Sequence, residues 1–150
     1  EAVSCLLIAN AKVEARDVEG GAPLHHGTLG GHEVVVTSLL RSLANVEARD
    51  AFGSTTMHIV ALFGYDNLFP RLLNASADVH CRDNDGRSAL DHALEPEPEV
   101  EWWEGHEKTV RLFMRAGAQP SPQLGQEKQA RHIGNCRPPM DAAMGFTGEW

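Results

Sequence analysis

A period of 33 residues constrains this chain more than any other feature of its sequence. The string VEARD at residues 13–17 returns unchanged at residues 46–50 and, weakened to VHCRD, at residues 79–83. Further columns agree when the chain is aligned on this period: Gly20, Gly53 and Gly86; the Leu-Leu pairs at 6–7, 39–40 and 72–73; and His25, His58 and Asp91. Agreement in so many columns predicts a stack of small repeated units rather than a domain with one central core.

Each repeat has the pattern of a turn followed by two short helices. The turn is an Asp-x-x-Gly step, in which Gly is free to take a positive φ. The first helix ends near Leu29, Leu62 or Leu94, and Gly31 and Gly64 separate it from a second helix. Such a unit cannot bury its own apolar side chains, so we expect neighbouring repeats to pack on each other.

These columns resemble the ankyrin repeat. The Thr-Pro-Leu-His signature of that family is matched by residues 22–25, 55–58 and 88–91, and its Gly-His step before the second helix by residues 31–32, 64–65 and 105–106. The closing Gly-Ala of the family is intact at residues 117–118. The resemblance covers roughly residues 1–120 and implies an all-α fold, an ankyrin-repeat solenoid of stacked helix pairs with short β-hairpin-like fingers.

The period also predicts the domain organisation. We expect an ankyrin-repeat array over residues 1–118 and a Pro- and Gly-rich C-terminal tail over residues 119–150. The array divides into a partial repeat at 1–16 and repeats at 17–49, 50–82 and 83–118, the last with an insertion at about 95–104. Because the partial repeat would leave apolar side chains uncovered, we expect the chain to be part of a longer protein or of a complex.

Three residues depart from the family pattern inside the array. Leu43 and Ser76 stand where the family has Gly at the end of the second helix, and a positive φ there costs a non-Gly residue about 1 kcal/mol or more. Pro70 lies in the first half of a second helix, so we expect a kink or a shortened helix start. These departures predict an array that is less stable than a consensus one.

Charge and cysteine content limit the classes of partner and compartment. The formal net charge of −8 disfavours nucleic acid and an anionic membrane surface, since both attract a surplus of Lys and Arg. No apolar run approaches the roughly 20 residues that span a bilayer, so we expect no membrane partner. Three cysteines without close pairing, Cys5, Cys81 and Cys136, argue against a disulfide framework. They favour an intracellular location, cytoplasm or nucleus.

The histidines raise the question of a metal or catalytic site. His25 and His58 occupy the signature position, where the resemblance implies that the ring ties the turn to the helix by hydrogen bonds. The spacing of His25, His26 and His32 matches neither a zinc finger nor a His-Glu-x-x-His motif. Asp91 beside His92 is more readily explained as a degenerate signature than as an acid–base pair. We therefore expect no enzyme, no catalytic residue, no cofactor and no metal.

Arginine precedes the turn aspartate in three repeats, at Arg16, Arg49 and Arg82. Turn chemistry explains the aspartates, whereas the fold does not demand the arginines. Two interpretations stay open. The arginines form a solvated row that pairs with neighbouring acids, or they form a contact row for an acidic partner.

The resemblance implies binding of a protein partner through the finger tips and the exposed side of the first helix. In the middle repeat these places hold Phe52, Leu62 and Phe63, and an apolar patch on a concave surface is typical of an interaction site. The other candidate partner contacts are Val18, Leu29, Arg49 and Arg87, together with Trp102 and Trp103 in the acidic insertion. For the Trp pair two interpretations stay open: one ring covers the last repeat and the other lies on the surface, or the insertion is a separate docking element for a basic partner. We expect a non-catalytic protein–protein interaction module of the scaffold type. The alternative is a regulatory or targeting segment of a larger enzyme or channel.

Overall fold

A computed structural model describes residues 11–94 and 104–121 of the chain. It contains the helices α2 (Pro23–Leu29), α3 (Glu33–Arg41), α4 (Thr56–Phe63), α5 (Phe69–Asn74), α6 (Ala89–Leu94) and α7 (Glu104–Arg115). Within these residues the only β pairing is an isolated bridge between Arg82 and Ser88. The expected all-α class is confirmed.

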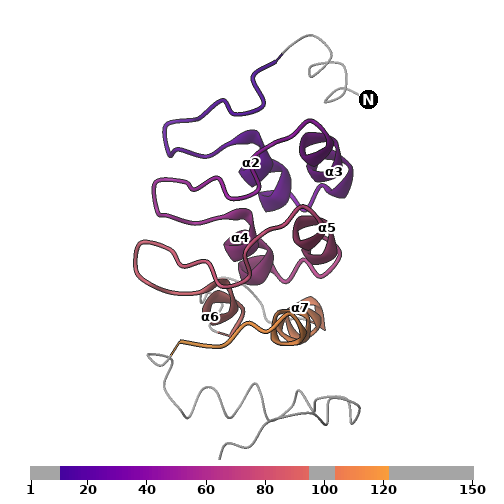
Figure 1. Cartoon of the computed structure of the whole chain (residues 1–150), viewed down its shortest axis with the longest axis vertical. Coiled ribbons are helices and arrows are strands. Elements are labelled where there is room, and N and C mark those ends of the chain that lie inside the picture. Colours follow the sequence, from indigo (N-terminus) through magenta and orange to yellow (C-terminus); the bar gives the residue numbers. More distant parts are fainter. Residues whose placement is uncertain (1–10, 95–103, 122–150) are drawn as a thin grey trace, which may run out of the picture.

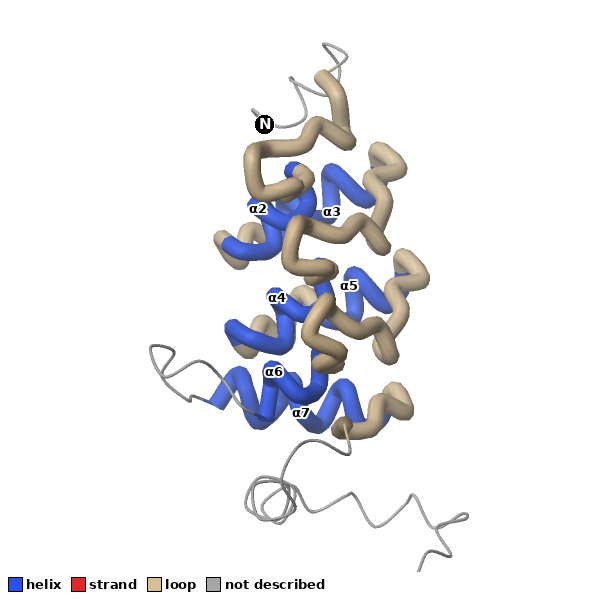
Figure 2. The backbone as a smooth tube through the Cα atoms, turned by 90° about the vertical axis from the view of Figure 1, so that its left-hand side faces the viewer, coloured by secondary structure: helices blue, strands red, loops and turns tan. Residues whose placement is uncertain are grey.

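The helices form two columns (Figure 1). The first helices of successive repeats, α2, α4 and α6, lie one below another and pack directly on each other. The second helices, α3, α5 and α7, make the other column, and the loops before α2, α4 and α6 project from the first column as fingers. Figure 2 shows the same stack turned by 90°. The first helices and the fingers thus lie on the same side of the stack.

The apolar core fills the space between the two columns. On α3, Val36 and Leu39 are one helical turn apart and buried, whereas Val34 on another face is 75% exposed. The core continues through the lower repeats with Met57, Val60, Leu72, Leu90, Val110 and Phe113, all buried. The rings of Phe69 and Phe113 meet edge to face, 4.8 Å apart, and join α5 to α7. The buried side chains thus form one core that continues from each repeat into the next.

Two predicted irregularities of the second helices are confirmed. Leu43 has φ 63° and Ser76 has φ 67°, so both non-Gly residues adopt the left-handed conformation that Gly117 takes at φ 88° in the last repeat. The start of α5 is shortened at Pro70. The 33-residue period places the counterpart of the first residue of α3 at Asp66, but α5 begins at Phe69.

The prediction that Gly105 and His106 precede the last helix is wrong. Both lie in the first turn of α7, which begins at Glu104. The backbone of this turn packs closely on Gly64, where an added Cβ would lie 2.7 Å from the amide nitrogen of His106. The His106 Nε2 also lies 2.8 Å from the carbonyl oxygen of Leu62, which fastens the start of α7 to α4.

The three arginines before the turn aspartates tie the fingers together. Each guanidinium donates from Nη1 to the carbonyl of a Gly in its own finger and to a second acceptor one repeat further on. The bonds are Arg16 to Gly20 (2.7 Å) and Arg49 (2.7 Å), Arg49 to Gly53 (2.9 Å) and Arg82 (2.5 Å), and Arg82 to Gly86 (2.7 Å) and the Ser121 hydroxyl (2.6 Å). The expectation that the fold does not demand them is wrong, because charge-assisted bonds to carbonyls hold adjacent fingers at a fixed spacing.

Candidate functional site

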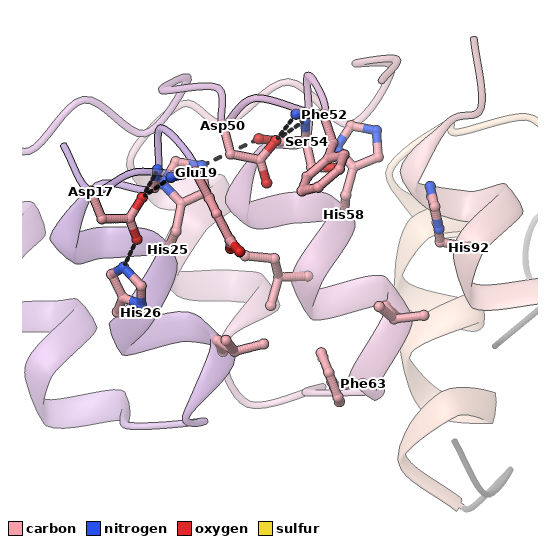
Figure 3. Close-up of a pocket in the computed structure, with 14 residues that line it drawn as sticks. Asp17, Glu19, His25, His26, Asp50, Phe52, Ser54, His58, Phe63 and His92 are labelled. Atoms are coloured by element: carbon pink, nitrogen blue, oxygen red, sulfur yellow. Dashed lines mark hydrogen bonds and ion pairs between the residues drawn. The ribbon is translucent and has the colours of Figure 1, made fainter. Parts of the chain in front are cut away.

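A groove of about 340 Å³ lies beneath the first and middle fingers, against the exposed side of the first helices (Figure 3). Its apolar lining consists of Leu29, Phe52, Ile59, Leu62 and Phe63. Its acidic lining consists of Asp17, Glu19 and Asp50. A hollow of this size accepts a few side chains, and apolar walls with a small number of polar groups are typical of binding sites.

Each finger is held by the aspartate at its base. Asp50 Oδ1 accepts hydrogen bonds from the backbone N–H of Phe52 (2.9 Å) and of Ser54 (2.8 Å). Asp17 and Asp83 make the same pair of bonds in their own fingers. The backbone of Phe52 is therefore fixed while its side chain is 65% exposed at the mouth of the groove.

Buried histidines join the first and middle fingers to the helices that follow them. In His58, Nδ1 accepts from the backbone N–H of Thr55 (3.1 Å), and Nε2 faces the carbonyl of Arg87 (3.3 Å) in the next finger. These partners require a neutral ring with its proton on Nε2. His25 makes the equivalent bonds to Ala22 and Ser54. The structural role predicted for both residues is confirmed.

Burial favours the neutral form of His58. It lowers the pKa of the ring to about 4, and the neighbouring His92 ring, 5.5 Å away between centroids, acts in the same direction.

In the third repeat, a carboxylate replaces the histidine ring. Asp91 Oδ2 accepts from the backbone N–H of Ser88 (2.8 Å), and Oδ1 accepts from that of Ser121 (2.7 Å). Asp91 is thus a substitute tie, and the acid–base pairing with His92 is not formed.

A second set of histidines, which the sequence analysis missed, meets the turn aspartates from below. His26 Nε2 lies 2.6 Å from Asp17 Oδ2, and His92 Nε2 lies 2.8 Å from Asp83 Oδ2. The backbone N–H of Gly21, and then the His26 ring, lower the pKa of Asp17. Burial would raise the pKa of Asp83, but hydrogen bonds led by the one from His92 lower it below its ordinary value. Alignment of residues 26, 59 and 92 on the period was the signal for this column.

The middle repeat departs from this arrangement. Ile59 occupies the place of His26 and His92, and it lines the groove. Within the described part of the chain, Asp50 uses Oδ1 for both of its hydrogen bonds and leaves Oδ2 without a partner. Figure 3 shows the second oxygen of Asp50 pointing away from the finger amides, whereas the corresponding oxygen of Asp17 meets His26.

The structure places the predicted contact residues in several surroundings. It brings Phe52, Leu62, Phe63 and Leu29 together in the lining of the groove. Val18, fully exposed at a finger tip, lies outside that lining. Arg49 is engaged in the finger ladder, and Arg87 lies 3.8 Å from both Asp83 and Asp85. Trp102 and Trp103 lie outside the described residues.

The geometry of the arginine row differs from the predicted pairing with neighbouring acids. The hydrogen bonds of Arg16, Arg49 and Arg82 go to carbonyl and hydroxyl oxygens rather than to neighbouring acids. Because each guanidinium spans two fingers, its donor groups are directed into the stack. The pairing with acids is therefore wrong, and contact of this row with an acidic partner stays a prediction.

Two further observations bear on the chemistry of the described residues. Over residues 11–94 and 104–121, no three His, Cys, Asp or Glu side chains are grouped to hold a metal ion, and no helix has the length and apolar character to cross a membrane. Cys81 is free and buried, and burial raises the pKa of its thiol to about 11. Its Sγ lies 3.2 Å from the Thr55 hydroxyl. This thiol therefore stays protonated at neutral pH and packs as a core residue.

A scan against protein-family models gives no match for this chain, and a search of curated proteins gives none either.

Proposed function

We propose that this protein is a non-catalytic interaction module built on an ankyrin-repeat solenoid, with the three loops as its fingers. The support is recurrence at 33 residues of three separate devices: the Asp turn, the buried tie at positions 25, 58 and 91, and the arginine ladder. The Asp turn fixes each finger internally, the buried tie joins a finger to the helix that follows it, and the arginine ladder joins adjacent fingers. A partner of such a stack meets a rigid, continuous surface.

The partner we propose is a protein that binds in the groove, on the concave side formed by the fingers and the first helices. The observation that carries this proposal is Phe52, an aromatic ring that is 65% exposed on a finger whose backbone is fixed at two amides. Leu62 and Phe63 line the same groove and extend its apolar surface. Exposed aromatic residues on rigid supports are frequent centres of protein interfaces.

A binding role without catalysis is supported by the occupation of the polar side chains. The rings of His25 and His58 have both nitrogens engaged by backbone groups, and the groove acids Asp17 and Asp50 hold turns. Covalent catalysis usually relies on a nucleophile with an adjacent base, whereas the rings of His25 and His58 are bonded to backbone groups. An intracellular location in cytoplasm or nucleus is part of this proposal, and it is supported by the free, buried thiol of Cys81.

The test compares Phe52→Asp with Val34→Asp in the full chain. Val34 is a matched control because it is 75% exposed on α3, outside the groove lining. Tagged wild-type and Val34→Asp proteins should capture the same partner from a cell lysate. Phe52→Asp should reduce capture by about tenfold or more, the effect expected when an interface centre is lost. Far-UV circular dichroism checks that all three proteins are equally helical, and unchanged capture by Phe52→Asp would contradict the site.

A further inference from the structure

The middle finger differs from its neighbours at a single carboxylate oxygen. In the first and third repeats, a histidine nitrogen lies within 2.6 to 2.8 Å of the Oδ2 of the turn aspartate. In the middle repeat Ile59 replaces that ring, and Oδ2 of Asp50 has no partner within the described residues. The same fold position thus holds a donor in two repeats and is open in the repeat that carries the apolar contacts.

The surroundings of this oxygen favour a cationic partner. Asp50 is half-buried and lines the groove with Phe52, Ile59 and Leu62. A carboxylate oxygen beside apolar side chains has fewer water contacts than one in open solvent, and it gains from a charged donor that arrives with the ligand. In the first repeat, the His26 nitrogen meets the equivalent oxygen, Oδ2 of Asp17, at 2.6 Å, and both residues line the groove.

Charge on the groove adds to the same preference. Asp17, Glu19 and Asp50 line it, and the chain carries a formal net charge of −8. Arg49, the nearest guanidinium in sequence, donates to the carbonyls of Gly53 and Arg82 in the finger ladder. The buried rings of His25 and His58 act as neutral ties. A negative, partly apolar groove attracts a positive and apolar segment.

We propose that the groove recognises a basic–apolar segment of a partner protein, with a Lys or Arg side chain bound to Oδ2 of Asp50. This inference rests on the proposed function, and it names the chemistry of the partner. The ammonium or guanidinium group takes the place that the His26 and His92 rings take in the neighbouring repeats. A flanking Leu, Ile, Met or Phe of the partner packs on Phe52 and Leu62, and the exposed face of Phe52 offers the cation a second contact.

The test is selection of random 12-residue peptides by the immobilised full chain, followed by sequencing. Three variants accompany the wild type. Asp50→Asn keeps an oxygen for the two finger amides and removes the charge. Ile59→His supplies the internal donor that the other two repeats have. Asp66→Asn is the matched control, since it removes one negative charge between α4 and α5, outside the groove lining.

Wild-type protein and Asp66→Asn should enrich peptides in which a Lys or Arg lies within a few residues of a large apolar residue. Asp50→Asn and Ile59→His should each weaken binding of a selected peptide by about tenfold, as expected for loss of one charge-assisted bond. Replacement of the basic residue of that peptide by norleucine should make wild type and Asp50→Asn bind equally. That equality assigns the basic group to Asp50.

Other outcomes overturn the inference. Enrichment of apolar peptides that lack a basic residue, with binding sensitive to Phe52→Asp but not to Asp50→Asn, would keep the proposed function and remove this one. Indifference to both Phe52→Asp and Asp50→Asn would remove both. The chain itself carries a stretch without acids that contains Lys128, Arg131 and Arg137. Displacement of selected peptides by a synthetic peptide of residues 128–137, with the same sensitivity to Asp50→Asn, would assign the groove to that segment instead. Concentration-dependent self-association in sedimentation, weakened by Asp50→Asn, would assign it to a second copy.

Discussion

The first and middle repeats build their fingers from the same hydrogen bonds and still present different surfaces to the groove. Asp17 and Asp50 each accept hydrogen bonds from the two equivalent amides of their own finger. His25 and His58 each bond to two equivalent backbone groups. Below the fingers, however, His26 contacts Oδ2 of the turn aspartate in the first repeat, whereas Ile59 takes the place of that histidine in the middle repeat. In a stack of this kind, the ties recur because each must join its neighbour, and the positions between them are free to carry binding chemistry.

The largest expected effect tests whether the two ties are equivalent. His58→Ala leaves the N–H of Thr55 and the carbonyl of Arg87 without their partner, and it should lower the free energy of unfolding by about 3 kcal/mol. His25→Ala removes the same kind of bonds and should cost about 2 kcal/mol. The cost is smaller because His58 makes additional contacts with the ring of His92 and the thiol of Cys81. Urea denaturation gives both values. A cost under about 0.5 kcal/mol for His58→Ala, the range of ordinary surface changes, would break the comparison.

The next effect is a loss of stability in mild acid that arises from His58 in the middle repeat. Burial lowers the pKa of His58 to about 4 from an ordinary value of 6.5, so the unfolded chain binds a proton that the folded chain does not. The contribution of this ring is fully present above pH 6.5 and is lost as the pH falls towards 4. The total loss is about 3 kcal/mol at most.

Urea midpoints measured between pH 7.5 and 4.5 check this, with His58→Gln as the comparison. The variant should lose much of the slope between pH 6.5 and 4.5. The pKa values of Asp83 and Asp91 are also lowered. The stability that these carboxylates contribute is present above the ordinary Asp pKa of 3.8 and is lost only below it, so it does not confuse the result. Equal slopes in both proteins would assign the acid sensitivity elsewhere.

A third effect concerns the ends of the second helices, where the repeats also differ. Leu43→Gly and Ser76→Gly should each raise the free energy of unfolding by about 1 kcal/mol, because both residues adopt a positive φ that favours Gly. Ser42→Gly is the control. Its φ is −88°, so the added freedom of the unfolded chain should make it destabilising by about 0.5 kcal/mol. Thermal unfolding of the three variants separates the two signs, and a loss at position 43 or 76 would contradict the strain.

The sequence alone predicts the parts of this architecture that depend on near neighbours along the chain. The turn bonds of Asp17 and the tie of His25 to Ala22 span two to four residues, so they recur wherever the short pattern recurs. The arginine ladder was not predicted, since the bond from Arg16 to Arg49 spans 33 residues and depends on how the fingers stack. The apolar half of the groove was anticipated at Phe52 and Leu62 from the family resemblance.

The acidic half of the groove was missed because it depends on side-chain direction. His26 reaches Asp17 across nine residues, and that pairing requires the finger to fold back over the helix. The unpartnered Oδ2 of Asp50 is recognised only by comparison with the other two repeats, in which the equivalent oxygens of Asp17 and Asp83 meet histidines. A repeat protein therefore supplies its own controls, since each position can be compared in neighbouring units.

The smallest expected effect comes from introducing into the middle repeat the histidine that its two neighbours have at this position. In Ile59→His, the introduced ring should meet Asp50 Oδ2 as His26 meets Asp17, and its pKa should rise above the ordinary value of about 6.5. A raised folded pKa contributes stability below the unfolded pKa, and this contribution is lost as the pH rises through the folded pKa. The gain should be only about 0.5 kcal/mol because the site is half-exposed, and it has the opposite sign to the effect of His58. Titration of the ring protons by NMR measures the pKa directly, and Ile59→Gln corrects for the lost apolar contact. A pKa at or below 6.5 would mean that the oxygen of Asp50 is not accessible from the groove.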